Sequence, residues 1–292
     1  MSFLQVIIMG VIHGLTEFLP VSSSGHLALF KILFGIEAET GILYEILLHV
    51  GTLAAICLVY YKDIFKLCAE GCRILRDAFV NVLIFFRNQI KRESEEYRKV
   101  ISNGYRKFVM LVLVSSIPTG VIGFFGRNAV ALASQILLVP GICLIVTAVL
   151  LFIADHSREG GKLPKSATYT DAFIIGISQG VATLPGLSRA GTTITAALLC
   201  GYQRNFAVKY SFIMSIPAIL GSLVLKLTML GKIAATPTEL ASYIIGMLVA
   251  AVIGYICIKT MLVIVRRKKF TIFAVYCLFI GMLSIGGYFY MA

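Results

Sequence analysis

The chain has 292 residues, of which 59% are hydrophobic and only 14% are charged, whereas a soluble protein carries roughly 25% charged residues. This composition argues against a soluble globular protein and indicates a polytopic membrane protein. The net charge of +12 would suggest nucleic acid as a partner of a soluble protein. Here the basic residues fall between apolar segments, so we expect no nucleic-acid partner.

Apolar segments of membrane-spanning length recur along the chain, and no window is polar enough to form a separate soluble domain. We therefore predict one all-α integral membrane domain over residues 1–292, with six transmembrane helices plus two re-entrant helical hairpins. The N-terminal segment has no basic residue before Lys31, so we expect no signal peptide. The predicted spans lie at about 41–61, 108–126, 136–154, 206–228, 240–260 and 271–291.

Two further apolar stretches, about 2–36 and 172–200, are interrupted by Pro, Gly and Ser. Each is predicted to form a hairpin of two half-length helices. Such hairpins are tolerated in a membrane only where protein or a watery cavity covers the freed backbone groups.

The basic residues predict the orientation of the chain. Placing 62–107, 155–171, 201–209 and 259–270 on the cytoplasmic side puts 21 of the 26 Lys and Arg residues there, as the positive-inside rule requires. Both termini are then outside. The 62–107 segment is predicted to be a cytoplasmic insertion whose apolar part, AFVNVLIFF, lies at the membrane interface. A second crossing in this segment is the alternative.

The two halves of the chain, about 1–154 and 169–292, carry similar motifs. PVSSSGH at Pro20 is similar to PGLSRAGTT at Pro185, and SSIPTGVIG at Ser115 is similar to MSIPAILGS at Met214. Three crossings per half would invert the second copy, so the two hairpin tips would enter from opposite faces and meet. Chance similarity of short Ser, Pro and Gly strings is the alternative.

Each hairpin tip is predicted to restart a helix, whose first N–H groups and positive dipole end form an anion site. Arg189, the only Lys or Arg between Lys165 and Arg204, adds a planar fork that suits phosphate oxygens. The alternative is a salt bridge from Arg189 to Glu17 or Glu45 that only fastens the halves together. The hydroxyl residues of the two tips are Ser22, Ser23, Ser24, Ser188, Thr192 and Thr193.

Acidic and imidazole side chains are expected near the same tips. His13 and Glu17 are four residues apart, as are Glu45 and His49, so each pair shares a helix face and the four side chains could point into one pocket. Carboxylates beside a phosphate site need a hard cation such as Mg²⁺ or Ca²⁺. The candidate metal ligands are Glu17, His13 and Glu45.

His26 follows the serine cluster and is a candidate base for Ser23 or a nucleophile itself. A single His in an apolar segment is more often structural. Three of the four His residues lie in the first 49 positions, beside both intramembrane Glu residues, and this clustering favours a functional role.

The sequence resembles the undecaprenyl-pyrophosphate phosphatases, a family of bacterial envelope synthesis whose overexpression gives bacitracin resistance. The similarity covers essentially the whole chain. Its most specific motifs are GLTEFLPVSSSGH, from Gly14 to His26, and PGLSRAGTT, from Pro185 to Thr193. The YEILLHVGTLAA stretch at Tyr44 and SIPA at Ser215 are also similar to family segments.

The resemblance implies a plasma-membrane enzyme that removes the terminal phosphate of a long polyprenyl pyrophosphate, with a divalent cation, at a site open to the outer face. The expected partners are this lipid substrate, membrane lipid and, if the chain is not monomeric, a second copy. The resemblance places Glu17 in the acidic motif, Ser23 and His26 in the first tip, and Ser188, Arg189 and Thr193 in the second. We predict that Glu17, Ser23, His26 and Arg189 are catalytic. The predicted substrate-binding residues are Ser22, Ser24, Ser188, Thr192, Thr193 and Gln179.

Two positions depart from the family pattern. His13 stands where the family normally has Glu or Gln, which puts the number of metal ligands in doubt because neutral imidazole is a poorer ligand for Mg²⁺ than carboxylate. Ala190 stands where the family normally has Ser, which removes a hydrogen bond near Arg189.

A second class of function fits the same pattern. Broken helices in an inverted repeat also build secondary transporters, so a flippase for prenyl phosphate or an anion transporter is the alternative. A transporter would need the anion site but no nucleophile. A purely structural membrane subunit would leave Arg189 unexplained.

Overall fold

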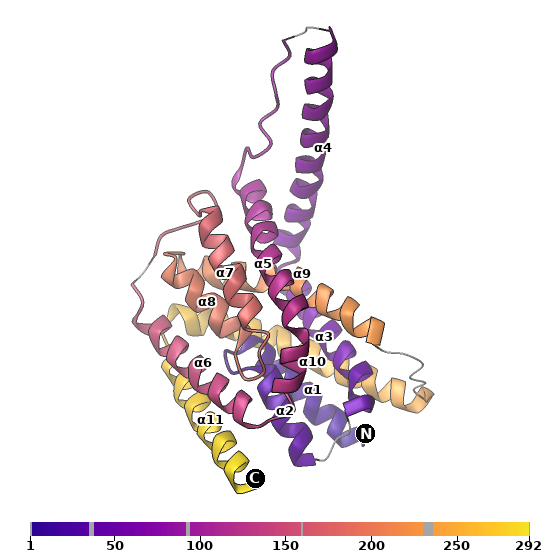
Figure 1. Ribbon diagram of the computed structural model, residues 1–292, viewed down its shortest axis with the longest axis vertical. Helices are drawn as coiled ribbons and strands as arrows, with labels where there is room; N and C mark the ends of the chain where they lie inside the picture. Colours follow the sequence, from indigo (N-terminus) through magenta and orange to yellow (C-terminus); the bar gives the residue numbers. More distant parts are fainter. Residues whose placement is uncertain (1, 35–37, 92–93, 159, 230–235, 292) are drawn as a thin grey trace.

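The computed structural model describes residues 2–34, 38–91, 94–158, 160–229 and 236–291. Within these ranges the regular structure is helical (Figure 1). The helices are α1 (Phe3–Phe18), α2 (Ser23–Phe34), α3 (Ala38–Val59), α4 (Tyr61–Lys91), α5 (Gly104–Ala133), α6 (Leu138–His156), α7 (Tyr169–Val181), α8 (Arg189–Leu199), α9 (Arg204–Met229), α10 (Pro237–Arg266) and α11 (Thr271–Met291).

Six of these helices are long and apolar enough to cross a membrane, namely α3, α5, α6, α9, α10 and α11. They coincide with the six predicted spans, which confirms the all-α transmembrane class. Many of their large apolar side chains are exposed, including Phe125, Val252 and Val275. A bilayer provides the apolar surroundings that these side chains need.

The two interrupted segments form pairs of short helices, as predicted. α1 has 16 residues and α2 has 12, while α7 has 13 and α8 has 11, so each is shorter than the roughly 20 residues that span a bilayer. The first break contains Ser22, whose φ of 70° lies in the left-handed region. The second contains Gly186, whose φ of 91° suits glycine. The re-entrant insertion of these pairs remains a prediction.

Helices from the two halves pack against each other reciprocally. α1 of the first half lies along α10 of the second, and α5 of the first half lies along α7 of the second. Small residues allow these close approaches: a Cβ on Gly10 would lie 2.7 Å from the Gly246 carbonyl oxygen, and the Thr119 hydroxyl donates to the Gly176 carbonyl oxygen at 2.8 Å. α6 and α11 pack side by side (Figure 1).

The second pair of similar motifs does not occupy equivalent places. Pro118 lies in α5, the second spanning helix after the first hairpin, whereas Pro217 lies in α9, the first spanning helix after the second hairpin. The tip motifs at Pro20 and Pro185 do correspond, since each separates two short helices. The boundaries of the half-repeats stay a prediction.

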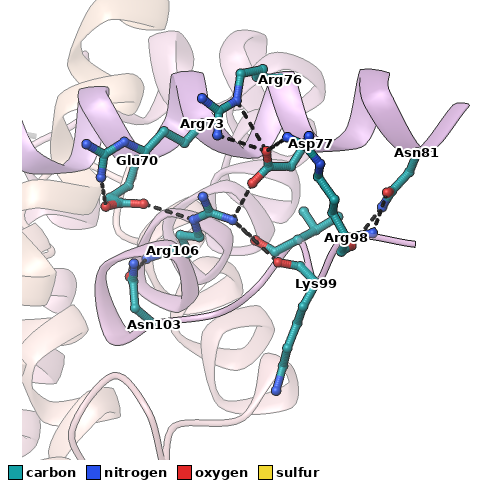
Figure 2. A network of polar contacts seen from close by, with 10 residues as sticks. Glu70, Arg73, Arg76, Asp77, Asn81, Arg98, Lys99, Asn103 and Arg106 are labelled. Carbon is teal, nitrogen blue, oxygen red and sulfur yellow. Dashed lines mark hydrogen bonds and ion pairs between the residues drawn. The ribbon is translucent and has the colours of Figure 1, made fainter. Parts of the chain in front are cut away.

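The 62–107 segment contains no candidate span among its described residues. Its apolar part belongs to α4, a 31-residue helix that projects beyond the other helices (Figure 1). Figure 2 shows the contacts that hold α4 to the start of α5: the guanidinium of Arg106 lies 2.9 Å from Glu70 and 2.8 Å from Asp77. Asn81 and the backbone of Arg98 exchange two hydrogen bonds of 2.8 Å.

Candidate active site

The two hairpin tips touch each other. A Cβ added to Gly25, near the start of α2, would lie 2.9 Å from the Cα of Gly186 in the second tip. Only glycines allow this approach. The helix starts that the sequence places in separate halves are therefore brought to one region, as predicted.

The helices α6 and α11 hold the two tips in place. In α6, the Thr147 hydroxyl accepts from the backbone N–H of Ser188 at 3.0 Å and donates to the Gly186 carbonyl oxygen at 3.2 Å. In α11, the thiol of Cys277 donates to the Pro20 carbonyl oxygen at 3.6 Å. Buried polar groups at each break are satisfied in this way, so the irregular backbone is stable inside an apolar bundle.

Glu17 joins the two tips. One of its carboxylate oxygens pairs with the guanidinium of Arg189, and the other accepts a 2.5 Å hydrogen bond from the Ser23 hydroxyl. Glu17 is buried, with a side chain that is 3% exposed, whereas the Arg189 side chain is 24% exposed. A cation that remains partly open beside a buried carboxylate can still meet an anionic ligand.

This ion pair is the contact that sequence reasoning offered as the purely structural alternative. A fastening role explains the contact between Arg189 and Glu17. It does not explain why Ser23 of the first tip donates to the same carboxylate, nor why the guanidinium keeps an exposed edge. A buried ion pair is weak evidence for stability. The arrangement therefore fits a ligand-binding site better than a contact that only fastens the two halves together.

The start of α8 is capped by a side chain of the second tip. Ser188 caps the helix, since its hydroxyl accepts from the Gly191 N–H at 3.1 Å. The Thr193 hydroxyl donates to the Arg189 carbonyl oxygen at 2.8 Å and contacts Ser211 of α9 at 2.5 Å. The Thr192 hydroxyl is buried without a partner among the described residues. An unpaired buried hydroxyl next to Arg189 is available to a ligand.

The first tip offers a similar set of hydroxyls. The buried Ser22 hydroxyl accepts from the Gly25 N–H at 3.3 Å and lies 3.3 Å from the Ser24 hydroxyl, which is exposed. Ser23 is half-buried between them. These three consecutive hydroxyls at a helix start therefore offer hydrogen-bonding groups to an anion at several depths between the surface and Glu17.

A cluster of three potential metal ligands adjoins this contact. Donor atoms of His13, Glu17 and His49 all lie within 4.8 Å of one another. His13 is fully buried, and neither of its ring nitrogens has a hydrogen-bonding partner in the part of the chain that the structure describes. Two imidazoles and a carboxylate form a chemically suitable ligand set for a divalent ion that accepts nitrogen ligands.

Glu45 takes a different position from the one expected of a metal ligand. Its carboxylate pairs with Lys226 of α9 at 2.9 Å, and it is not in the three-residue cluster. Its neighbour on the same helix face, His49, is in the cluster instead. His49 shares that face with Glu45, and their spacing alone does not favour the imidazole over the carboxylate as a ligand.

His26 and Gln179 lie apart from the contact between the tips. His26 donates from Nδ1 to the Ser22 carbonyl oxygen at 2.8 Å, so its Nε2 accepts from the Tyr276 hydroxyl of α11 at 2.7 Å. Gln179 is buried and donates to Thr119 and to the Met214 carbonyl oxygen. Neither makes a described hydrogen bond to Glu17, Ser23 or Arg189.

A small cavity adjoins the ion pair. Its volume is about 10 Å³, close to the space for one water molecule, and it must widen before a diphosphate can enter. Two of its polar lining residues come from α9: Ser211 lies in no motif of the sequence, and Ser215 belongs to the SIPA motif, which did not by itself link it to the tips. The lining residues are Glu17, Phe18, Ile56, Arg189, Ala190, Ser211, Phe212 and Ser215.

Residues 6–283 match the family model described as bacitracin resistance protein BacA. Three similar proteins are each named undecaprenyl-diphosphatase. The one from Desulfatibacillum aliphaticivorans is 39% identical, covering 96% of this chain and 97% of its own length. Those from Alkaliphilus metalliredigens and Methanosphaera stadtmanae are 36% and 35% identical, each covering 98% of both chains. With six spanning helices and a match over nearly its whole length, the chain is a multi-pass membrane protein that belongs to the BacA family.

Proposed function

We propose that the protein hydrolyses undecaprenyl pyrophosphate to undecaprenyl phosphate and inorganic phosphate, and so recycles a lipid carrier of cell-wall synthesis. The observation that carries the proposal is the contact of Glu17 with Ser23 of one tip and Arg189 of the other. This contact puts a carboxylate, a hydroxyl and a guanidinium together. The relatives' shared name supports the same activity.

The positive groups of the site bind and orient the diphosphate. Arg189 matches two phosphate oxygens at once, and the N–H groups at the starts of α2 and α8 add positive potential. In the transition state of phosphoryl transfer, charge spreads over the oxygens of the transferred group. Donors that are already fixed in place stabilise that charge without reorganising.

Ser23 is the group best placed to attack the terminal phosphorus. Its hydroxyl already donates to Glu17, so Glu17 can accept the proton while a bond forms between Ser23 Oγ and phosphorus. The anhydride bond breaks, and undecaprenyl phosphate leaves. Water then releases phosphate from Ser23. His26 is the alternative nucleophile, but both of its ring nitrogens are engaged by Ser22 and Tyr276.

The proposal includes a divalent cation, for which the sequence suggests Mg²⁺ or Ca²⁺. Glu17, His13 and His49 are the residues that would hold it. When bound, such an ion offsets the charge of phosphate oxygens and polarises the phosphoryl group. Glu17 still holds Arg189 and Ser23 in place for the substrate.

The location of the reaction is also part of the proposal. The distribution of Lys and Arg supports both termini outside, and the family resemblance implies a site that opens to the outer face. The prenyl chain would stay in lipid between helices while its diphosphate reaches the tips. Whether a second copy is needed is tested by the mass of the purified protein in detergent.

Phosphate release from purified protein tests the activity. With a divalent cation, the protein is expected to release phosphate from farnesyl or undecaprenyl pyrophosphate, and EDTA is expected to stop the release. Radiolabel from the terminal phosphate should be trapped on Ser23 after rapid acid quench, and Ser23→Ala should abolish both label and turnover. Proteoliposomes that move prenyl phosphate without releasing phosphate would instead support the transporter.

A further inference from the structure

We propose that His13, Glu17 and His49 form a metal site of the zinc type, which prefers a divalent ion with affinity for imidazole over Mg²⁺ and Ca²⁺. This inference deepens the proposed function, because the ion would serve the same site. It rests on three features of the cluster: its geometry, the unpaired state of His13 and the orientation of His49.

The three donor groups of the cluster are already close to the spacing that a bound metal ion requires. His13 and Glu17 lie one turn apart on α1, and His49 comes from α3. Their donor atoms lie within 4.8 Å of one another. Ligands at 2.0–2.1 Å from a tetrahedral zinc ion are about 3.4 Å apart, so the side chains need to move by roughly 1 Å. The rings of His13 and His49 already lie together, with centroids 4.9 Å apart.

His13 has no hydrogen-bonding partner of its own. It is fully buried, and both of its ring nitrogens lack a partner among the described residues. A buried polar group without a partner costs free energy, and such groups in native structures call for an explanation. A bound metal ion would accept the lone pair of one of these nitrogens. An aliphatic side chain packed beside the ring cannot.

His49 is oriented as a metal ligand. Its Nδ1 donates to the Glu45 carbonyl oxygen at 2.7 Å, which leaves the lone pair of Nε2 free to bind. Metal-bound histidines commonly donate their other N–H to a carbonyl or carboxylate, which fixes the ring and its tautomer. This contact therefore supplies the outer shell of the site.

The donor set decides which ion is preferred. Two imidazoles and one carboxylate with an open position are a common catalytic zinc set. Ca²⁺ takes six to eight oxygens, and Mg²⁺ prefers oxygen ligands and waters. The nearest further carboxylate, Glu45, is engaged by Lys226. A carboxylate at position 13 would make the set richer in oxygen, so the residue at this position sets the preference.

Metal binding to the full-length protein, stripped with chelator, tests the inference. One Zn²⁺ per chain is expected after dialysis, retained against an approximately 1,000-fold excess of Mg²⁺ or Ca²⁺, with two nitrogen ligands in the zinc X-ray absorption spectrum. His13→Ala and His13→Gln should each weaken Zn²⁺ binding by at least the roughly 10-fold to 100-fold that loss of an outer-shell partner costs. His156→Ala, at the end of α6, is the matched control and should bind like the wild type.

Three results would overturn the inference: tighter binding of Mg²⁺ or Ca²⁺ than of Zn²⁺, no zinc at all, or undiminished binding in both His13 variants. His13→Glu is expected to move the preference toward Ca²⁺ and Mg²⁺. The tests separate this inference from the proposed function. Zinc binding without phosphate release would refute only the function, and phosphate release with Mg²⁺ in a protein that excludes zinc would refute only the inference.

A separate observation concerns α4, and from it we infer that the exposed apolar face of this helix lies on an anionic lipid surface. Most of its exposed apolar residues are spaced three or four apart and form one stripe along the helix. At 1.5 Å per residue this stripe runs for about 45 Å. Its exposed members are Tyr61, Phe65, Cys68, Cys72, Leu75, Phe79, Val82, Phe86 and Ile90.

The other faces of α4 explain why lipid suits this stripe. The acids Asp63, Glu70 and Asp77 point toward Lys209 and Arg106 of the bundle, so their charge is used within the protein. Basic residues border the stripe on one side. Each also pairs with an acid, Glu70, Asp77 or Glu95, but their side chains remain more than half exposed. These are Arg73, Arg76 and Arg87, at 58%, 64% and 55%.

Charge and position both favour lipid over a second copy. α4 begins two residues after the spanning helix α3 ends at Val59, so its first turn starts at a membrane surface. An apolar stripe with a basic border matches the acyl boundary and the anionic headgroups. Two copies that packed antiparallel through the same stripe would instead bring their basic borders together.

The absence of Trp from the chain permits a direct test. A Phe79→Trp reporter in vesicles of phosphatidylcholine and phosphatidylglycerol is expected to be quenched by brominated acyl chains, because an interfacial helix buries its apolar face by roughly 5–10 Å. Lys66→Trp, on the polar side, is the matched control and should be quenched much less. Phe279→Trp, exposed on α11, should report full lipid contact.

An unquenched Phe79→Trp reporter would overturn the α4 inference, provided that the variant elutes as the wild type does in detergent. Crosslinking through Cys72 then shows whether a second copy or water, rather than lipid, contacts the stripe. A disulfide dimer that forms in dilute vesicles without quenching means that a second copy covers the stripe, and absence of both signals means that the stripe faces water.

Discussion

Replacement of Arg189 is the most direct test of the site, because one side chain links both tips. Arg189→Ala removes the partner of Glu17 and the only guanidinium in the lining of the small cavity. An arginine that stabilises phosphoryl transfer is worth about 10³-fold to 10⁵-fold in rate. Since the Arg189 side chain is 24% exposed and thus partly screened, we expect the lower end. A 10³-fold loss corresponds to about 4 kcal/mol at 1.36 kcal/mol per factor of ten.

Arg189→Lys refines this prediction. Lysine keeps the charge but lacks the fork that would pair with Glu17 and a phosphate oxygen at the same time. We therefore expect an intermediate loss, on the order of 10-fold to 100-fold. Arg127→Ala is the matched control, because Arg127 contacts Phe124 outside the site. The assay is phosphate release from undecaprenyl pyrophosphate at saturating and limiting substrate, so that kcat and kcat/KM are separated.

The same variants separate a chemical role from a fastening role. If the pair only fastens the halves, Arg189→Ala should lower the midpoint of thermal unfolding in detergent, and Glu17→Gln combined with Arg189→Met should restore stability and activity together. If the pair belongs to the site, activity is lost while unfolding changes little, and the double variant stays inactive. Turnover of Arg189→Ala within tenfold of the wild type would refute the reasoning.

Three further predictions concern Ser23, the packing of α10 and the contacts of α4. Ser23→Ala should reduce phosphate release by at least about 10³-fold with unchanged elution in detergent, and turnover near the wild-type rate would exclude Ser23 as nucleophile. Gly246→Ala should destabilise the protein by roughly 1–3 kcal/mol in denaturant unfolding, because its Cβ would overlap the Tyr44 hydroxyl; Gly126→Ala, with open space around it, should not. Hydrogen bonds from Arg106 hold the pKa of Asp77 below its ordinary value of 3.8. Their contribution is therefore complete above that pH and lost as the pH falls through the lowered pKa. Hydrogen exchange in α4 should accelerate below pH 3.8, and an unchanged rate down to about pH 2 would contradict this account.

The sequence by itself determined the spanning helices and the places where helices break. Each span is a local property, because a run of about 20 apolar residues can satisfy its own backbone only as a helix in lipid. The breaks at Pro20 and Pro185 are equally local. Ser188 follows the second break and caps α8, as its position in the motif predicts.

The tertiary structure decided how the site residues are paired. Sequence reasoning left Arg189 with either Glu17 or Glu45 as partner, and the packing gives Arg189 to Glu17 and Lys226 to Glu45. It also brings His49, rather than Glu45, into the cluster with His13. These choices depend on how α1, α3 and α9 are rotated against one another, which helical periodicity within one segment does not encode.

Contacts between distant segments also set the roles of His26 and α4. His26 turns to Tyr276, 250 positions away, so its place after the serine cluster did not reveal its partner. α4 is held by ion pairs to Arg106 at the start of α5, which no local pattern in its apolar stretch predicts. Local sequence specifies where a helix can form because its hydrogen bonds are internal, whereas the partner of a side chain depends on packing across the whole bundle.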